Sequence, residues 1–571
     1  MIHHRCDFER DTDSLAFSAF RRGYQPKYPK LLDAFTHLRC ESSAISSVSH
    51  DSLTKAQLSE AFSHSFKLPL LRWSQQPTEY ANEIPLPCRI GVLFSGGPSP
   101  GGHNVLAGLL DGLASAGSGH ELWGFWDGPS GLIHDRKFLI TPELLAPFRN
   151  SGGFHFLGTG RTKIEKQSDL MRALAVLKDS GIQALVIIGG DDSNTNAAHL
   201  AEFFAQNNSG IAVVGVPKTI DADLQNDYVA TTFGFDTAVK VYSEMISHIA
   251  RDAASARKYY HFVRLMGRSA SHITLEAALQ THPTAALIAE EIAAQEWSLR
   301  DVVLYLSRII KERAENGLRH GVILVPEGLV EHIPEMKALV RDLNVWLATA
   351  TVTPADISQN RPAILETMLP ALSMDARRCF LSLPDDIQDQ LLKERDPHGN
   401  VIVSAIETEK LLIELLEKEL EEQRQQGHFQ SSFGWQRHFL GYEGRCAAPT
   451  NFDADYAYAL GRVAALLGVT KKNGYMAALE GLPKASTEWV PVGVPLASLL
   501  TYEWRSGHAK AVISKALVNL EGRAFKSFAA ARQDWANEDC FRFSGPIQYF
   551  GPDALCDQRP LSLVDQSPGL R

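Results

Sequence analysis

The stretch VIIGGDDSNTNAA, from Val186 to Ala198, contains the features from which the fold can be predicted. An apolar run ends at Gly189-Gly190, and Ser193 and Thr195 behind it are suited to capping a following helix. Glycines at such a junction let the backbone approach a phosphate, and a helix N-terminus adds free N–H groups and a positive dipole end. Yet Asp191 and Asp192 open this loop. The sequence therefore raises the question of how a phosphate site tolerates two carboxylates.

The same arrangement recurs along the chain. Short apolar runs end at Gly or Pro in CRIGVLF (88–94), ALVIIGG (184–190), GIAVVGVP (210–217) and GVILVPEG (321–328), with helical patterns between them. This alternation is typical of βαβ units. It predicts an α/β protein with two Rossmann-like, three-layer αβα domains and parallel-rich sheets. Ligands of such sheets bind at the carboxyl ends of the strands, where all these motifs lie.

We expect four regions along the chain. They are a mostly helical extension (1–84), a large α/β domain (85–237, completed by about 445–500), a small α/β domain (238–444, with a helical insertion at about 335–432) and a C-terminal extension (500–571). The insertion contains ETEKLLIELLEKELEEQRQQG (407–427), whose leucines recur at helical spacing. Such a stripe is more typical of a helix packed on its own domain than of one that binds a partner.

Composition excludes several classes of function. The chain has 571 residues and a net charge of −10, which argues against binding nucleic acid or an anionic membrane. No apolar run is long enough for a transmembrane helix, and the N-terminus lacks a signal-peptide pattern. The seven cysteines are scattered, without CxxC pairs, which favours reduced thiols. We therefore expect a cytoplasmic protein.

Two further loops are candidates for phosphate chemistry. FSGGPSPGGHN (94–104) follows a strand and precedes an apolar helix, but it is neither GxGxxG nor a Walker A loop. GVPKTIDADLQN (215–226) contains Lys218, which can orient a phosphate while one of its two aspartates takes a proton from an attacking hydroxyl. Asp191 could hold Mg²⁺, which prefers carboxylate and phosphate oxygens. The alternatives are a tight turn, an ion-paired surface loop and an acidic helix N-cap.

Two later segments supply cations. RKYYHFVRLMGRSASH (257–272) and GWQRHFLGYEGRCAAPTNFD (434–453) contain arginines, which can grip a phosphate ester through two hydrogen bonds. Taken alone, most such arginines lie at a surface. His438 is more readily explained as structural than as catalytic, since nothing in the sequence pairs with it.

Six motifs, in the order SGG..PG, GGDD, PKTIDAD, MGR, PEG and GYEGR, together resemble the phosphofructokinase family. The resemblance spans about residues 88–480 apart from the insertion, and it is closest to the long, pyrophosphate-dependent branch. It implies reversible phosphoryl transfer from pyrophosphate to the 1-hydroxyl of fructose 6-phosphate, giving fructose 1,6-bisphosphate and phosphate, in glycolysis or gluconeogenesis. It further implies Mg²⁺ as cofactor and a homodimer.

The resemblance also implies roles for individual residues. Asp221 matches the base that activates the sugar hydroxyl, and Asp191 matches the Mg²⁺ carboxylate. The other catalytic positions are Asp192, Lys218, Thr219, Asp223 and Arg268. The substrate-binding positions are Gly96, Gly97, Arg161, Ile220, Lys258, Tyr259, Met266, Gly267, Glu327, Arg437, Tyr442, Glu443, Gly444 and Arg445. Lys258 and Tyr259 match a position where a neighbouring subunit completes the site, and Lys163 is expected to assist Arg161.

Two positions distinguish the phosphoryl donor. ATP-dependent members of the family have Gly in place of Asp192 and of Lys218. A glycine leaves room for the rest of a nucleotide, whereas an aspartate fills that space and repels it, and Lys218 adds a cation at the inorganic phosphates. Three alternatives stay open: an ATP-dependent enzyme, a non-catalytic regulatory subunit that binds sugar phosphates, and a kinase for NAD or lipids, which would lack the PKTIDAD and PEG motifs.

Overall fold

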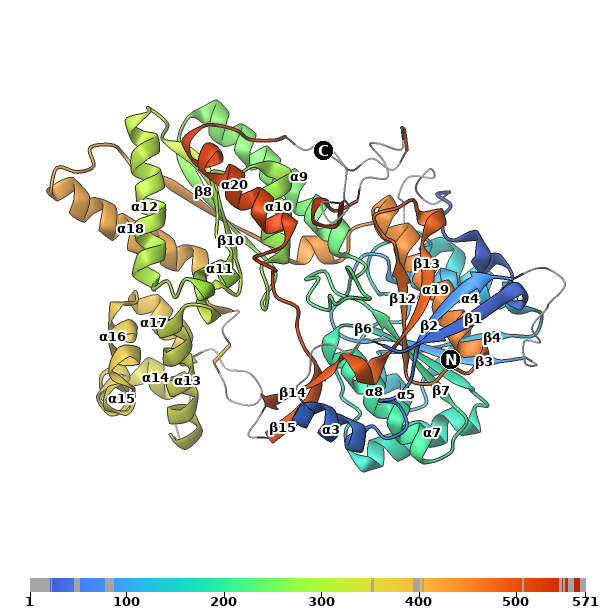
Figure 1. Ribbon diagram of the computed structural model, residues 1–571. Helices are drawn as coiled ribbons and strands as arrows, with labels where there is room; N and C mark the ends of the chain where they lie inside the picture. The colour runs from blue at the N-terminus through green and yellow to red at the C-terminus, as the bar shows by residue number, and fades with distance from the viewer. Residues whose placement is uncertain are drawn as a thin grey trace. The chain divides into compact units, whose positions relative to one another are not determined.

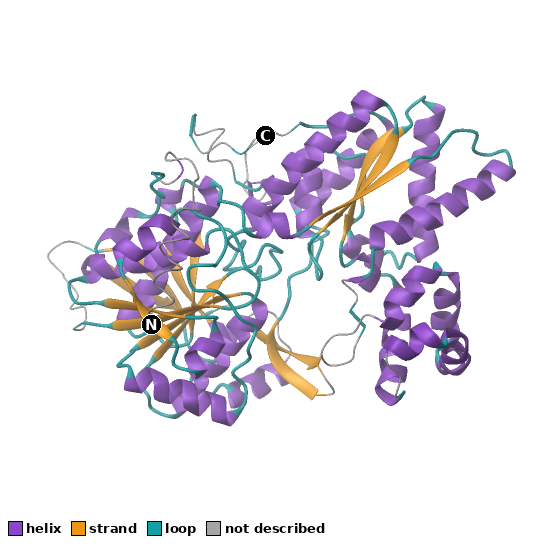
Figure 2. Cartoon of the chain, turned by 180° about the vertical axis from the view of Figure 1, so that it is seen from behind, coloured by secondary structure: helices purple, strands orange, loops and turns teal. Residues whose placement is uncertain are grey.

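The computed structural model describes residues 21, 23–45, 52–76, 87–350, 354–393, 401–402, 405–505, 508–543, 547, 550–552 and 559–564. The chain divides into two compact units (Figure 1). Unit 1 comprises Met1–Ala238, Glu443–Ala516 and Ile547–Arg571, and unit 2 comprises Val239–Tyr442 and Leu517–Pro546. Each unit contains its own sheet with helices around it, as Figure 2 shows. The expected α/β fold class is confirmed.

Unit 1 is built on a nine-stranded sheet with the order β1-β2-β13-β12-β7-β6-β3-β4-β5. Its centre, from β12 to β4, is parallel, and the flanking strands pair antiparallel. The strands are β1 (Leu38–Ser43), β2 (Leu70–Gln75), β3 (Arg89–Phe94), β4 (Glu121–Phe125), β5 (Lys137–Ile140), β6 (Ala184–Gly189), β7 (Ala212–Pro217), β12 (Tyr475–Glu480) and β13 (Val490–Pro495).

Residues of β6 alternate between the two faces of this sheet. Val186 and Ile188 belong to one buried cluster with α4 (Gly102–Ala116) and α19 (Asn451–Val469). Leu185 and Ile187 belong to a second cluster with α7 (Gln167–Asp179) and α8 (Asp191–Gln206). A strand that is buried on both faces reads as a continuous apolar run, which is the pattern of the sequence here. The three layers follow from this double burial.

The described part of the N-terminal region contains strands, which the sequence did not indicate, beside helical turns. Its described part contains one α-helix, α3 (Ser52–Ala61), two short 3₁₀ turns, η1 (Lys30–Asp33) and η2 (Phe35–His37), and the two strands β1 and β2. Both strands lie at one edge of the sheet, and β2 pairs with β13. Antiparallel pairing with a strand more than 400 residues away leaves no local signal in the sequence, because it depends on tertiary contacts.

A hairpin of β14 (Leu500–Arg505) and β15 (His508–Ile513) follows the main sheet of unit 1. The backbone N–H of Ile513 donates to Thr195 Oγ1 at 2.9 Å, so β15 is attached to α8. Three residues later the N–H of Ala516 donates to the carbonyl of Asp223 at 2.8 Å. The hairpin thus ends beside two of the loops that the sequence singles out.

Unit 2 has a parallel sheet with the order β11-β8-β10-β9, made of β8 (Tyr259–Leu265), β9 (Ala285–Ala286), β10 (His320–Pro326) and β11 (Trp435–Leu440). Helices line it, among them α9 (Phe235–Ala256), α10 (His272–Thr281), α11 (Ala289–Ala294), α12 (Leu299–Glu315) and α20 (Arg523–Asn537). The helix α12 begins with a capping box between Ser298 and Asp301.

The expected insertion is helical and consists of α13 (Pro334–Thr349), α14 (Pro354–Gln359), α15 (Arg361–Met368), α16 (Met374–Ser382), α17 (Asp385–Lys393) and α18 (Thr408–Gln425). Its leucine stripe is buried: Leu411, Leu412, Leu416 and Leu420 all lie in the core cluster of unit 2. The interpretation of this helix as one packed on its own domain is confirmed.

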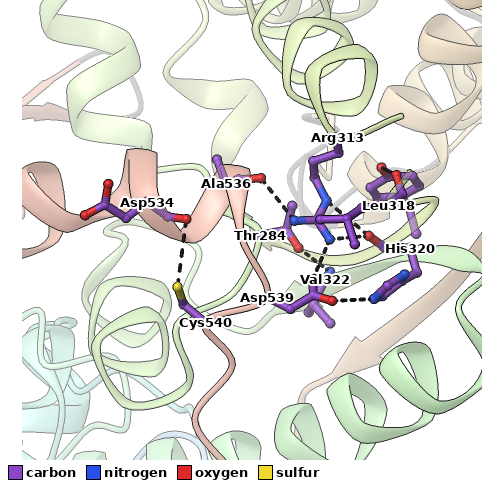
Figure 3. Close-up of polar contacts among 10 residues, drawn as sticks. Thr284, Arg313, Leu318, His320, Val322, Asp534, Ala536, Asp539 and Cys540 are labelled. Carbon is purple, nitrogen blue, oxygen red and sulfur yellow. Dashed lines mark hydrogen bonds and ion pairs between the residues drawn. The ribbon is translucent and has the colours of Figure 1, made fainter. Parts of the chain in front are cut away.

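The C-terminal part of unit 2 is attached by charged groups (Figure 3). The fully buried Arg313 donates to the carbonyls of His320 and Ala536 and pairs with Asp539 at 2.7 Å. The Nε2 atom of His320 lies 2.8 Å from the same carboxylate. Because every partner is within hydrogen-bonding distance, this cluster fixes the segment around Ala536 and Asp539 to the rest of unit 2.

No helix in the described ranges has both the length and the apolar character needed to cross a membrane. The cysteines that the structure describes are free thiols: Cys40, Cys88, Cys379, Cys446 and Cys540.

Candidate functional site

In unit 1 the guanidinium of Arg445 lies against the backbone of the loop that follows β3. Gly96 has a φ of 86°, and its N–H donates to the carbonyl of Gly160 at 2.9 Å. A Cβ at Gly97 would lie 1.8 Å from the guanidinium Nη2 of Arg445, so a larger residue there would displace this guanidinium. Gly96, Gly97 and Arg445, three positions predicted to bind substrate, are therefore in one place. Arg161 is exposed and directly follows Gly160.

The helix α8 begins at Asp191, with Gly190 as its N-cap. Asp191 and Asp192 lie in its first turn, where the helix dipole favours negative charge. The Oγ of Ser193 donates to the Oγ of Ser95 at 2.8 Å, which joins this loop to the glycine loop. Two carboxylates are therefore tolerated here partly because they stand at the positive end of a 16-residue helix.

The two aspartates differ in their surroundings. The side chain of Asp192 is 54% exposed, and its Oδ1 lies 3.5 Å from the ammonium of Lys163. The side chain of Asp191 is only 17% exposed and faces Lys515. Lys163 pairs with Asp192 in the structure. That it assists Arg161 stays a prediction.

The loop after β7 contains Lys218, a buried residue whose ammonium lies beside the glycine loop. The N–H of Lys218 donates to the carbonyl of Gly189, and its ammonium lies 3.6 Å from where a Cβ of Gly96 would stand. Lys218 is only 7% exposed, and this burial lowers its pKa from 10.5 to about 8, although Asp221 partly offsets the effect. The structure thus brings Lys218 and Gly96 together.

Three carboxylates gather beside this lysine. The pKa of Asp223 is raised to about 7, first by burial and then by the charges of Asp221 and Asp191. The N–H of Asp221 donates to Thr219 Oγ1 at 3.1 Å, so its loop is held in a tight turn. Ile220, between them, is buried. Mutual repulsion of this kind is typical of a site that binds a cation or an ammonium group.

Lys515 is a member of this cluster that no pattern in the sequence singles out. Its Nζ lies 3.9 Å from Asp191 Oδ2 and 3.9 Å from Asp223 Oδ2. It comes from the segment after β15, almost 300 residues from Asp223, and belongs to no motif. A lone lysine after a surface hairpin carries no local signal of its position.

In unit 2 the MGR and PEG motifs meet at the carboxyl ends of neighbouring strands. The N–H of Gly267 donates to Glu327 Oε2 at 3.2 Å, and a Cβ at Gly328 would lie 1.9 Å from the carbonyl of Arg268. Gly267 has a φ of 130°, which favours glycine. Met266 and Arg268 flank this contact, and the Arg268 side chain is exposed.

Other predicted positions in unit 2 are not brought to this point. Lys258 and Tyr259 lie at the start of β8, roughly 20 Å along the strand from Met266. Arg437 is in the middle of β11 and pairs with Glu407 at 2.8 Å. Tyr442, at the end of unit 2, is 68% exposed. Glu443, the first residue of the second segment of unit 1, is exposed, and Gly444 is buried.

His438 has a structural partner. Its Nε2 lies 2.9 Å from Nδ1 of His261 on the neighbouring strand. Burial lowers the pKa of both rings, that of His261 to about 4. A neutral, stacked pair is consistent with the structural interpretation made from the sequence.

The residues of unit 1 fit a magnesium ion that arrives with its phosphate ligand. The described residues contain no cluster of three or more His, Cys, Asp or Glu side chains arranged to hold a metal alone. Mg²⁺, however, is usually held by one or two carboxylates together with substrate phosphates and water. Asp191, at the head of α8 and beside the lysine-lined glycine loop, supplies a carboxylate of this kind.

Comparison with known proteins identifies the family to which the chain is similar. The phosphofructokinase family pattern matches residues 89–467. The chain is 45% identical to a protein of Porphyromonas gingivalis named pyrophosphate–fructose 6-phosphate 1-phosphotransferase, over 95% of this chain and 97% of that protein. It is 47% identical to the beta subunit of the enzyme of that name in Solanum tuberosum, over 82% of this chain and 80% of the relative.

A solved structure, a pyrophosphate-dependent phosphofructokinase of Nitrosospira multiformis, resembles the chain with a TM-score of 0.50. The match covers 76% of this chain and 86% of that one, at 15% sequence identity. At this identity the likeness concerns the fold alone.

Proposed function

The chain belongs to the phosphofructokinase family, and we propose that it transfers a phosphoryl group reversibly from pyrophosphate to the 1-hydroxyl of fructose 6-phosphate. The products are fructose 1,6-bisphosphate and phosphate. The observation that carries the proposal is the position of Lys218, whose buried ammonium lies beside Gly96 and among Asp191, Asp221 and Asp223. A lysine in this place supplies positive charge to a small inorganic anion, and the named relatives use pyrophosphate.

Each group of unit 1 has a role in this proposal. Lys218, Arg445 and the backbone of Gly96 and Gly97 bind pyrophosphate, and Thr219 and Asp223 border the transferred group. Asp221 accepts the proton of the sugar hydroxyl as it attacks phosphorus. Asp191 would hold Mg²⁺, which when bound neutralises charge on the phosphate oxygens. Lys218 and Arg445 stabilise the charge that develops on the leaving phosphate.

Unit 2 supplies the sugar-phosphate residues. Arg268 forms the charged contact with the 6-phosphate, and Glu327, held by the N–H of Gly267, accepts hydrogen bonds from sugar hydroxyls. We also infer a cytoplasmic homodimer. Lys258 and Tyr259 support this inference, because they lie at the far end of β8 from Arg268 and match a position that serves a neighbouring subunit.

The test is a donor assay on purified protein, with the mass in solution measured beside it. We expect turnover with pyrophosphate and none with ATP. Turnover with ATP alone would favour the ATP-dependent alternative. A protein that is inactive alone and active with a second chain would favour the regulatory-subunit alternative.

Donor selectivity is tested on Asp192 and Lys218 together. Lys218→Gly should lower turnover with pyrophosphate by roughly a hundredfold, since a buried charge-stabilising group is lost. Asp192→Gly should admit ATP, and the double variant should use ATP better than the single effects predict, because the two positions border one ligand.

Lys163→Met is the matched control for the Asp192 variant. It removes the ion-pair partner of Asp192 and leaves the carboxylate in place. ATP turnover that appears in Lys163→Met as strongly as in Asp192→Gly would assign selectivity to that surface pair. No ATP turnover in any of these variants would overturn the steric account of Asp192.

A further inference from the structure

Lys515 lies at equal distances from two carboxylates of the phosphate-binding loops. Its ammonium is 3.9 Å from Asp191 Oδ2 and 3.9 Å from Asp223 Oδ2, and its side chain is 26% exposed. Both distances are longer than a hydrogen bond, so the ammonium balances two charges without being fixed to either. Its position differs from that of Lys218, which is buried against the glycine loop.

The backbone on both sides of Lys515 is attached to the loops that it serves. Two residues before it, the N–H of Ile513 donates to Thr195 in α8, the helix that begins with Asp191. One residue after it, the N–H of Ala516 donates to the carbonyl of Asp223. A lysine on an ordinary surface hairpin needs no such anchors. The two bonds fix the point from which its side chain reaches the carboxylates.

The charge of the cluster explains why a second lysine is needed. Asp191, Asp221 and Asp223 lie close enough to one another to raise the pKa of Asp223. Lys218 also lies beside them, Arg445 lies close to Lys218, and these two cations face the glycine loop. Without Lys515, the site would lose one of the two ammonium groups that oppose the raised pKa of Asp223, and an anionic substrate would meet a more negative site.

We propose that Lys515 is a charge-balancing residue that binds pyrophosphate. In the empty site it neutralises Asp191 and Asp223. With pyrophosphate bound and Asp191 holding a divalent cation, which would neutralise that carboxylate, the Lys515 ammonium would turn to a phosphate oxygen. The proposal rests on the proposed function. It adds to the site a residue that lies outside the matched family region, residues 89–467, and comes from the segment after the β14–β15 hairpin.

The proposal predicts that in Lys515→Met the affinity for pyrophosphate falls while the affinity for Mn²⁺ rises. In Lys515→Met, the KM for pyrophosphate should rise by at least about tenfold, because a cation facing the anion is lost. The KM for fructose 6-phosphate should stay within about twofold. The substrate-free protein, in which two carboxylates can bind Mn²⁺ only weakly, should bind it several-fold more tightly in calorimetry, because Mn²⁺ no longer competes with an ammonium for them. Lys515→Arg should recover part of the pyrophosphate affinity.

Lys510→Met is the matched control, since Lys510 lies on β15, five residues before Lys515, but pairs with Glu165 on the surface. It should change neither affinity. Unchanged pyrophosphate KM and unchanged Mn²⁺ affinity in Lys515→Met would overturn the proposal. So would a fall of both affinities together with the melting temperature, which indicates a purely structural role. If the unaltered protein has no pyrophosphate-dependent activity, the proposed function fails, and the Mn²⁺ measurement still tests the charge balance.

Discussion

Unit 1 contains two pairs of neighbouring aspartates. Burial raises the pKa of one member of each pair, but the two pairs differ in their hydrogen bonds. The pKa of Asp223 and that of Asp453 are both raised to about 7, in each case first by burial and then by a neighbouring carboxylate. The neighbour is Asp221 for the first and Asp236 for the second. A raised pKa alone therefore does not separate a functional aspartate from a structural one.

Hydrogen bonding separates them. The carboxylate of Asp453, in the first turn of α19, accepts from the N–H of Gly234 at 2.9 Å and from the N–H of Thr237 at 2.8 Å, and the Thr237 hydroxyl donates to it as well. The carboxylate of Asp223 faces the ammonium of Lys515 at 3.9 Å. A buried carboxylate that receives short hydrogen bonds from the fold stabilises it, whereas one that faces an ammonium beyond hydrogen-bonding distance is placed to meet a ligand.

The largest effect should come from Asp221→Asn. The amide keeps the shape but cannot take the proton of the sugar hydroxyl, so kcat should fall by roughly a thousandfold. The melting temperature should be unchanged or higher, because the repulsion with Asp223 is relieved. A coupled assay and thermal unfolding measure the two quantities. A kcat within tenfold of the unaltered protein would contradict the role of Asp221 as the base.

Asp453→Ala should lower stability and keep activity, which is the opposite of the result expected for Asp221→Asn. Three donors lose their acceptor in a fully buried place, so the free energy of unfolding should fall by about 3 kcal/mol in urea titrations, while kcat per folded molecule is kept. Asp179→Ala, at the exposed end of α7, is the control and should change stability by less than about 0.5 kcal/mol. A stable but inactive Asp453→Ala protein would contradict the structural role assigned to Asp453.

Much of the candidate site could be predicted because its signals are local. The strand-glycine-helix pattern at 184–198 places Asp191 at a helix start, and the structure agrees. The meeting of Gly267 with Glu327 follows from two strands that end at the same edge of a parallel sheet. Each of these inferences needs only the pattern within one stretch and the general rule for ligand position in α/β sheets.

What could not be predicted depends on pairings between distant segments. Lys515 reaches its carboxylates through a hairpin docked on α8, and the pairing of Lys163 with Asp192 depends on how two loops meet. The edge strands β1 and β2 form because β13 offers an unpaired edge, which an isolated N-terminal sequence does not reveal. Tertiary context decides these features.

The smallest effect, and the finest test of the comparison, is a change in pH dependence. The raised pKa of Asp453 means that the folded protein keeps a proton up to about pH 7, whereas the unfolded chain loses it near pH 4. The stability from this group is therefore complete below pH 4 and is lost as the pH rises to about 7. Asp236→Asn removes the neighbouring charge and should lower the pKa of Asp453, so that less stability is lost over this range.

The measurement is the free energy of unfolding in urea at pH 5 and pH 8 for both proteins. The amide that Asp236→Asn introduces keeps an oxygen that can accept from the Thr450 hydroxyl, as the carboxylate of Asp236 does, so the fold should tolerate the change. The unaltered protein should lose more stability between the two pH values, by about 1.4 kcal/mol for each unit by which the Asp453 pKa differs. An equal loss of stability in both proteins between pH 5 and pH 8 would show that burial alone raises the pKa of Asp453. The two aspartate groups would then differ in their like-charge repulsion as well as in their hydrogen bonds.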